Sequence, residues 1–303
     1  MTLRFGSDEE PGIRRRGTVR MSYVNDRTGR APSKADMERI NALAVPPAWT
    51  DVWIAADPDS HVQATGRDAK GRKQFRYHPD FVADRASNKF ASLIEFAARL
   101  GPLRRRVDRD LRASSMSYDR VVATVVRLLD LTSLRVGNEE YARTNNSFGL
   151  TTLRNRHAVV NGSTIQFRFI GKSAKRFDLT VENKRLAKVV SACQDLAGQR
   201  LFEYEDVDGT VRPIGSQDVN AYLSEHAAPR TTAKTFRTWN ATVMAVEQLA
   251  EAAQVYEPTK RVVTETVRAV ASELGNTPTV CRTSYVHPFV IVSYLDGSLL
   301  PAW

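Results

Sequence analysis

Along most of the chain, apolar residues recur at intervals of three and four positions, the spacing that gathers them on one face of an α-helix. One such run begins at Ser87, and we expect Gly101-Pro102 to end it because proline cannot continue a helix. A short helix is predicted after Ser33, ending at Pro46-Pro47. Further helices are predicted at 117–131, 183–196, 217–226, 232–253 and 259–274, and after Pro288.

Other stretches alternate between apolar and polar residues, which is typical of β-strands. Short strands are predicted at 52–54, 61–65 and 73–77. Further along, Asn161-Gly162 separates two such runs and predicts a hairpin with a type I′ turn, and residues 176–181 predict a third strand. Because a turn at 171–175 joins the last two strands, Lys172 and Lys175 are expected outside the core.

The order of these patterns predicts an α+β fold: a small strand-rich N-terminal domain and a larger, mainly α-helical domain that holds a small three-stranded sheet. The period changes near residue 86, so we place the domains at 21–86 and 87–303. Residues 1–20 are polar and contain Arg14-Arg15-Arg16, and we interpret them as a loosely ordered basic arm. We expect the segment 276–285 to be a mobile loop.

Composition places the chain among soluble globular proteins, since 42% of its 303 residues are hydrophobic and 26% are charged. No apolar run approaches the roughly 18 residues that a membrane-spanning helix needs. The first residues, MTLRFGSDEEPG, lack the apolar segment of a secretory signal. With only Cys193 and Cys281, a disulfide framework is not expected. We therefore expect a cytoplasmic protein.

The charge balance indicates a class of partner. The chain has 44 Lys and Arg against 34 Asp and Glu, giving a net charge of +10 and a pI near 9.8, which favours polyanions such as nucleic acid. The excess is concentrated at 62–78, 99–112 and 154–176. Such clusters are typical of surfaces that contact phosphates. The alternative for each cluster is a solvated basic face.

Several enzyme classes are excluded by motifs that the sequence lacks. Gly171-Lys172-Ser173 looks like the end of a nucleotide-binding P-loop, but Gln166 stands where the first glycine is needed. Gly66 and Gly71 have the P-loop spacing, but Arg72 follows them instead of lysine. The sequence contains neither a GxSxG nor a GxGxxG motif, and its histidines and cysteines lack zinc-ligand spacing. No metal, nucleotide or other cofactor is therefore expected.

Four short motifs follow one another along the larger domain. They are Leu134-Arg135-Val136-Gly137, the lysine of FRFIGKSAK (Lys172), Lys234-Thr235-Phe236-Arg237, and the tyrosine of TPTVCRTSYVHP (Tyr285). In this order they resemble the type IB DNA topoisomerases of the poxvirus-like and bacterial branch, whose catalytic fold is shared with tyrosine recombinases. The stretch RVGNEEYARTNNSFGLTTLRNRH is the most specific match, and the resemblance covers about residues 20–300.

The resemblance implies an ATP-independent enzyme that nicks one strand of duplex DNA through a 3′-phosphotyrosyl intermediate, relaxes supercoils by strand rotation and religates the strand. Tyr285 would be the nucleophile. Arg135 and Arg237 suit the phosphate oxygens, because arginine binds them bidentately and remains charged as negative charge grows in the transition state. Lys172 suits protonation of the departing 5′-oxygen, because lysine is an acid whose pKa can be tuned.

One catalytic position departs from the pattern of this family. Members often have a histidine nine residues before the tyrosine, and this chain has Asn276 there. Asparagine can donate a hydrogen bond to a phosphate oxygen but cannot carry a charge or shuttle a proton. We expect activity to survive with Asn276 in this position.

The resemblance also implies that the N-terminal domain clamps double-stranded DNA, with KGRKQFRY in the major groove. Basic residues beside a strand are expected at phosphates, and the side chains of the strand at base edges or at the backbone. The predicted DNA contacts are Lys70, Arg72, Lys73, Gln74, Phe75, Tyr77, Tyr141, Lys175 and Lys234. The expected form is a monomer clamping DNA, associated with the nucleoid.

Two other functions fit part of the pattern. A tyrosine recombinase or integrase would share the catalytic fold, but recombinases usually carry His-x-x-Arg where this chain has Lys234 and Arg237. A non-enzymatic basic DNA-binding protein would use the three basic clusters alone. It would bind DNA in a salt-sensitive manner without a covalent adduct.

Overall fold

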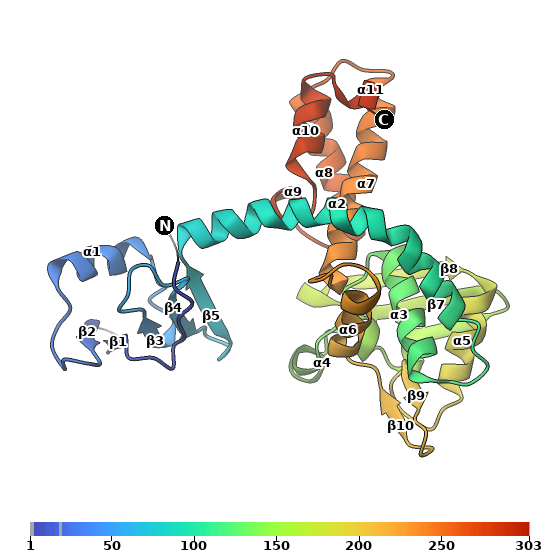
Figure 1. The fold of residues 1–303 in the computed structure, drawn as a ribbon, viewed down its shortest axis with the longest axis horizontal. Coiled ribbons are helices and arrows are strands. Elements are labelled where there is room, and N and C mark those ends of the chain that lie inside the picture. Colours follow the sequence, from blue (N-terminus) through green and yellow to red (C-terminus); the bar gives the residue numbers. More distant parts are fainter. Residues whose placement is uncertain (1–2, 18–19, 303) are drawn as a thin grey trace. The chain divides into compact units, whose positions relative to one another are not determined.

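The computed structural model describes residues 3–17 and 20–302, apart from the side chains of residues 86–89 and 302. The chain divides into two compact units, Met1–Phe90 and Ala91–Trp303, where the sequence placed a boundary near residue 86. The first unit is rich in strands and the second is mainly helical with a small three-stranded sheet (Figure 1). The predicted α+β class is confirmed.

The first unit is an antiparallel sheet with one helix packed on it. The strand order is β2-β1-β3-β4-β5, with β1 (Ile13–Arg16), β2 (Ser22–Asn25), β3 (Thr50–Ile54), β4 (Val62–Arg67) and β5 (Lys73–Tyr77). Helix α1 (Lys34–Ala42) begins at the predicted residue, because the Ser33 side chain accepts the backbone N–H of Asp36 at 3.1 Å. Ile40 of α1 packs into the same core as Ile13 and Ile54.

The interpretation of residues 1–20 as a loosely ordered arm is wrong for Ile13–Arg16, which form β1 between β2 and β3. Residues 1–2 and 18–19 of this arm lie outside the described residues. Ile13 is the single apolar residue of the strand, so the sequence has no alternation to detect. Its side chain is nevertheless only 1% exposed. Arg15 also donates a hydrogen bond to the carbonyl of Pro46 at 3.1 Å.

Helices make up most of the second unit, and α2 enters it from the first unit. Their bounds are α2 (Pro79–Asp110), α3 (Tyr118–Thr132), α4 (Glu139–Asn145), α5 (Lys184–Gln194), α6 (Ser216–His226), α7 (Ala233–Ala253), α8 (Lys260–Leu274), α9 (Pro278–Ser284), α10 (Pro288–Leu295) and α11 (Leu299–Ala302). None of the helices formed by described residues is long and apolar enough to cross a membrane.

Two groups of strands complete the second unit. The predicted three-stranded sheet is confirmed, in the order β6-β7-β8, with β6 (Ala158–Asn161), β7 (Thr164–Ile170) and β8 (Arg176–Glu182). A second hairpin, β9 (Glu203–Glu205) and β10 (Val211–Pro213), was not predicted because its strands are too short for a pattern. A 3₁₀ turn, η3 (Lys172–Ala174), joins β7 to β8.

Helix α7 belongs to two apolar cores. Its first residues, including Phe236, pack into a core built around α3, β7 and α5. Its later residues, including Ala245 and Leu249, pack with α8 and α10. Figure 1 shows α8, α10 and α11 gathered around this later part of α7. One rigid helix therefore ties the C-terminal helices to the sheet and to α3.

The predicted bounds of the long helix were wrong at both ends. Helix α2 begins at Pro79 rather than Ser87 and continues through Gly101-Pro102 to Asp110. A proline inside a helix costs about 3 kcal/mol. The side chains of Phe96, Leu103 and Val107 are each at most 2% exposed. Burying such side chains contributes about 1.5–3 kcal/mol each, so packing outweighs the local penalty.

Two predicted loops also differ from the structure. The β6–β7 turn consists of Gly162 and Ser163, because Asn161 pairs with Thr164. Only Gly162 has a positive φ, so the turn is not type I′, which needs a positive φ at both positions. The segment 276–285, expected to be a mobile loop, contains helix α9 with Thr277 as its N-cap.

Candidate active site

The loop after α3 presents Arg135 to the site. Helix α3 ends at Thr132, and its C-cap residue Ser133 has a left-handed backbone (φ 54°) that turns the chain away. The next segment runs against Gly149 and the residues after it. The N–H of Leu150 donates to the carbonyl of Arg135 at 2.9 Å, and that of Thr151 to the carbonyl of Val136 at 2.7 Å. The backbone of Arg135 is therefore fixed by neighbouring backbone.

Arg237 lies on the first turns of α7 and is 4% exposed. Its guanidinium donates to the carbonyls of Ser133 and of Leu274, the latter at 2.8 Å. Arg135 donates to the carbonyl of Gly275 at 3.1 Å and to the side-chain oxygen of Asn276. Burial lowers the pKa of both arginines, and the charge of Arg135 adds to the lowering for Arg237. Arginine remains protonated in proteins even so.

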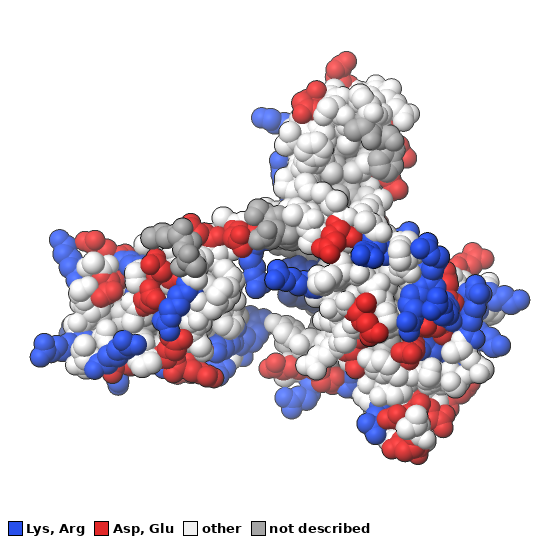
Figure 2. All heavy atoms as spheres, in the orientation of Figure 1, with Lys and Arg blue, Asp and Glu red and all other residues white. Residues whose placement is uncertain are grey.

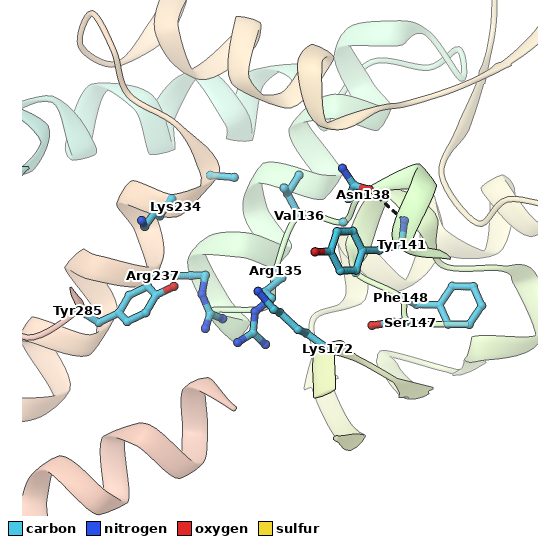
Figure 3. A pocket seen from close by; sticks show the side chains of 13 residues that line it. Arg135, Val136, Asn138, Tyr141, Ser147, Phe148, Lys172, Lys234, Arg237 and Tyr285 are labelled. Carbon is cyan, nitrogen blue, oxygen red and sulfur yellow. Dashed lines mark hydrogen bonds between the residues drawn. The ribbon is translucent and has the colours of Figure 1, made fainter. Parts of the chain in front are cut away.

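Neither guanidinium forms an ion pair with any carboxylate among the described residues. Both line a pocket of about 300 Å³, and none of the described residues that line it is Asp or Glu. Figure 3 shows the side chains of Arg135, Arg237, Lys172 and Tyr285 around one space. Buried charge is costly without a partner of opposite sign. The pocket therefore favours an anion.

Tyr285 is held at the end of α9. Its N–H donates to the carbonyl of Cys281 at 2.9 Å, and Cys281 and Val286 are fully buried. The hydroxyl of Thr242 donates to the carbonyl of Tyr285 at 3.2 Å. The Arg237 guanidinium lies 5.2 Å from the centre of the Tyr285 ring. In Figure 3 the Tyr285 hydroxyl is on the side of the ring that faces the pocket.

Lys172 stands at the start of η3, in the turn where the sequence placed it. Its ammonium forms no hydrogen bond or ion pair within the described part of the chain. Figure 3 shows the side chain reaching toward Arg135. Tyr141 and Lys234 line the same pocket. Tyr141 is oriented by the first turn of α4, where the side chain of Asn138 accepts the Tyr141 N–H at 3.0 Å.

The other two residues predicted for this unit lie beside the pocket. Asn276 does not line it, and its oxygen accepts from Arg135. The amide nitrogen of Asn276 is buried and has no hydrogen-bond partner among the described residues. Lys175 donates from its ammonium to the carbonyl of Ser272 at 2.6 Å, in the last turn of α8.

The remaining predicted DNA contacts belong to the β4–β5 hairpin of the first unit. Phe75 and Tyr77 are each 42% exposed, with their rings stacked 5.8 Å apart. The basic side chains are partly paired: Arg72 with Asp68 at 2.6 Å and Lys73 with Asp8 at 2.7 Å.

In the same hairpin, Gln74 donates to Asp68 at 3.0 Å, and Lys70 is exposed at the turn. Ion pairs also take up part of the basic cluster at 99–112, where Arg104 pairs with Asp130 and Arg106 with Asp110. Figure 2 shows Lys and Arg gathered over the C-terminal part of α2.

The sequence did not reveal what holds the two arginines. Apart from the Asn276 side chain, their hydrogen-bond acceptors are the backbone carbonyls of Ser133, Leu274 and Gly275, and a carbonyl has no signature in a sequence. One signal was available. Gly137 (φ 113°) and Gly149 stand on either side of a close backbone approach, where a Cβ added to Gly149 would lie 2.6 Å from the Gly137 nitrogen.

Comparisons with known proteins identify the family of the chain. Residues 73–292 match the family "Eukaryotic DNA topoisomerase I, catalytic core", and residues 20–68 match "Bacterial DNA topoisomerase IB, N-terminal domain". The chain is similar to DNA topoisomerase 1B of Acanthamoeba polyphaga mimivirus, with 32% identity over 271 residues, 86% of this chain and 81% of the relative.

It is also similar to DNA topoisomerase 1B of Vaccinia virus (strain Copenhagen), with 19% identity over 78% of this chain and 73% of the relative. Among solved structures, the XerH site-specific recombinase bound to difH substrate aligns with a TM-score of 0.40 and 11% identity. That alignment covers 63% of this chain and 49% of the other.

Proposed function

Because the chain belongs to the type IB DNA topoisomerase family, a family of isomerases, we propose that it relaxes supercoiled DNA without ATP. It binds double-stranded DNA as a monomer, nicks one strand through a 3′-phosphotyrosyl bond to Tyr285, and religates the strand after rotation.

The observation that carries the proposal is the pair of guanidiniums of Arg237, which is buried, and Arg135, which is half-buried; both face a pocket without acidic lining and have no carboxylate partner among the described residues. A phosphodiester supplies the missing negative charge. Both groups are fixed by backbone carbonyls before any DNA arrives, so stabilising the transition state needs little reorganisation.

The first step exchanges one phosphoester bond for another. The Tyr285 oxygen bonds to phosphorus as the bond from phosphorus to the 5′-oxygen breaks, and the phenol proton leaves to solvent. Arg135 and Arg237 hold the non-bridging oxygens, on which negative charge grows. Lys172 gives a proton to the departing 5′-oxygen, a role that its place on an exposed turn at the pocket supports.

The reverse step uses the same groups. The 5′-hydroxyl returns its proton to Lys172 and attacks phosphorus, and the Tyr285 oxygen leaves and takes a proton from solvent. The bonds broken and formed are of the same type, so no nucleotide has to be hydrolysed. Asn276 contributes through Arg135, which donates a hydrogen bond to the Asn276 side-chain oxygen. The Asn276 amide nitrogen is buried outside the pocket lining, so it would donate to a phosphate oxygen only after a local shift.

The N-terminal unit would supply further DNA contacts. On β5, Phe75 and Tyr77 offer exposed rings to bases or sugars, and the turn before it offers Lys70 to a phosphate. Lys73 would have to leave Asp8 to contact DNA. In the second unit, Tyr141 and Lys234 line the pocket and would contact the phosphates beside the scissile one.

The test is a covalent adduct on a duplex that loses a short 3′ fragment when it is cut, so that religation is prevented. When the label is on the 5′ side of the cleavage site, the wild-type protein should become covalently labelled. When the label is on the released 3′ fragment, the protein should remain unlabelled. Tyr285→Phe should give no adduct but bind the duplex normally. Tyr256→Phe, at an exposed tyrosine that does not line the pocket, is the matched control and should react like the wild type. An adduct formed by Tyr285→Phe would overturn the proposal.

A further inference from the structure

Three cations from three different elements meet at the last turn of α8. Arg237 from α7 donates to the carbonyl of Leu274 at 2.8 Å, and Arg135 from the loop after α3 donates to that of Gly275 at 3.1 Å. The third is Lys175, whose ammonium donates to the carbonyl of Ser272 at 2.6 Å. The last carbonyls of a helix lack the regular partner four residues on and carry partial negative charge, so they attract cations. The Ser272 carbonyl does so while it also accepts the Gly275 N–H at 3.1 Å.

Lys175 closes the turn that carries Lys172. The carbonyl of Lys175 accepts the N–H of Gly171 at 2.8 Å, so the two residues bracket η3. Within η3, Ser173 (φ 63°) and Ala174 (φ 58°) both have left-handed backbone. Such conformations are unfavourable for residues other than glycine and persist only where the surroundings hold them. The loop of Lys172 is therefore under strain and needs an anchor.

Packing makes the same connection between the turn and α8. A Cβ added to Gly275 would lie 2.9 Å from the ring of Phe177 and 3.1 Å from Cδ of Lys175. The stem of Lys175 and the first residues of β8 thus lie directly against the end of α8. The Lys175 ammonium also lies 5.9 Å from the centre of the Phe177 ring. One side of the turn is therefore held against α8 by the Lys175 ammonium, the Lys175 methylene stem and the Phe177 ring.

We infer that Lys175 is a positioning residue: it anchors the strained turn to the end of α8 and so holds the Lys172 ammonium in the pocket beside the two arginines. This differs from the DNA contact that the sequence indicated for Lys175, because its charge is engaged within the protein. The inference rests on the proposed function, in which Lys172 protonates the departing 5′-oxygen.

The test uses three variants. Lys175→Met keeps the apolar stem and removes the donor, and Lys175→Arg restores a cationic donor. Lys184→Met removes the same charge from an exposed position at the start of α5 and is the matched control. Each protein is assayed for duplex affinity and for single-turnover cleavage of two substrates, one ordinary and one with sulfur in place of the bridging 5′-oxygen. Thermal unfolding verifies that each variant is folded.

The sulfur substrate separates positioning of the acid from other roles. A thiolate leaves without a proton, because a thiol is far more acidic (pKa about 8.5) than an alcohol. Misplacement of a catalytic group by about 1 Å can cost on the order of 100-fold. We expect Lys175→Met to slow cleavage of the ordinary substrate by roughly 10- to 100-fold. On the sulfur substrate its rate should equal that of the wild type, its affinity should match that of Lys184→Met, and Lys175→Arg should recover most of the rate.

Three results would overturn the inference. One is an equal loss of rate on both substrates, which would mean that Lys175 does not act through the leaving-group proton. Another is a loss of affinity alone, which would make Lys175 a DNA contact. The third is a wild-type rate for Lys175→Met on the ordinary substrate. Failure of the wild type to cleave either substrate would instead defeat the proposed function on which the inference rests.

Discussion

Replacing Gly149 with alanine would place a methyl group in the closest backbone approach of the candidate site. Its Cβ would lie 2.6 Å from the carbonyl oxygen of Arg135 and 2.6 Å from the nitrogen of Gly137. Gly149 has an extended backbone (φ −141°) that alanine also adopts, so the effect is steric and not conformational. The two segments must move apart, and Arg135 must move with them.

The size of the effect follows from two opposing terms. Non-bonded contacts are favourable at about 3.5–4.0 Å, so a shift of roughly 1 Å is needed. Overpacking of this kind costs about 1–3 kcal/mol. Alanine also restricts the unfolded chain, which recovers about 0.4–1 kcal/mol. We therefore expect a net loss of about 1–2 kcal/mol, or a fall in Tm of roughly 2–8 °C. Displacement of Arg135 should slow cleavage by roughly 10- to 100-fold.

The assay combines thermal unfolding with single-turnover cleavage. The matched control is Gly215→Ala, at a glycine with φ −102° where the nearest atom would be 3.4 Å away. In this variant, replacing the glycine N-cap with alanine destabilises the protein, and restricting the unfolded chain stabilises it by a similar amount. The free energy of unfolding should therefore change by less than about 1 kcal/mol. Wild-type stability and cleavage for Gly149→Ala would refute the view that this backbone contact fixes Arg135.

Three further predictions concern other parts of the chain. Asp8→Asn should strengthen duplex binding, because it frees Lys73 from its ion pair with Asp8. The slope of log binding constant against log salt concentration should become steeper by about one unit. The control Glu9→Gln removes the same charge and should leave this slope unchanged. Burial and neighbouring arginines lower the pKa of His157, so the unfolded state takes up a proton at higher pH than the folded state does. The free energy of unfolding should therefore fall as pH drops below about 6.5. Urea titrations should show a weaker fall for His157→Gln than for the wild type, and an identical fall would contradict this. Both cysteines are buried, and burial raises the pKa of Cys193 to about 12, so a thiol reagent at pH 8 should modify neither until the protein unfolds; rapid labelling of the native protein would exclude this packing.

The parts of the fold that the sequence predicted are those where one pattern persists over many residues. Helices α3, α7 and α8 and the β6–β8 sheet have long apolar faces, and their residues appear at the expected positions. Strand β1 was missed because it holds a single apolar residue among arginines. The prediction for helix α2 ended too early, at Gly101-Pro102. Packing outweighs the cost of the proline there, and no local sequence pattern reports packing.

The candidate site divides in the same way. Four side chains with recognisable chemistry, Arg135, Lys172, Arg237 and Tyr285, were predicted and line one pocket. The carbonyls that hold the arginines, at the ends of α3 and α8, could not be predicted. They depend on how helices end in three dimensions, and the residues that supply them have no distinctive side chain.

Relaxation of negatively supercoiled plasmid, without ATP and with EDTA, tests the central claim most directly. The wild type should convert the plasmid to relaxed topoisomers, and Tyr285→Phe should leave it supercoiled while still binding DNA. Relaxation by both proteins would contradict the role of Tyr285. Binding without relaxation by the wild type would contradict the proposed activity.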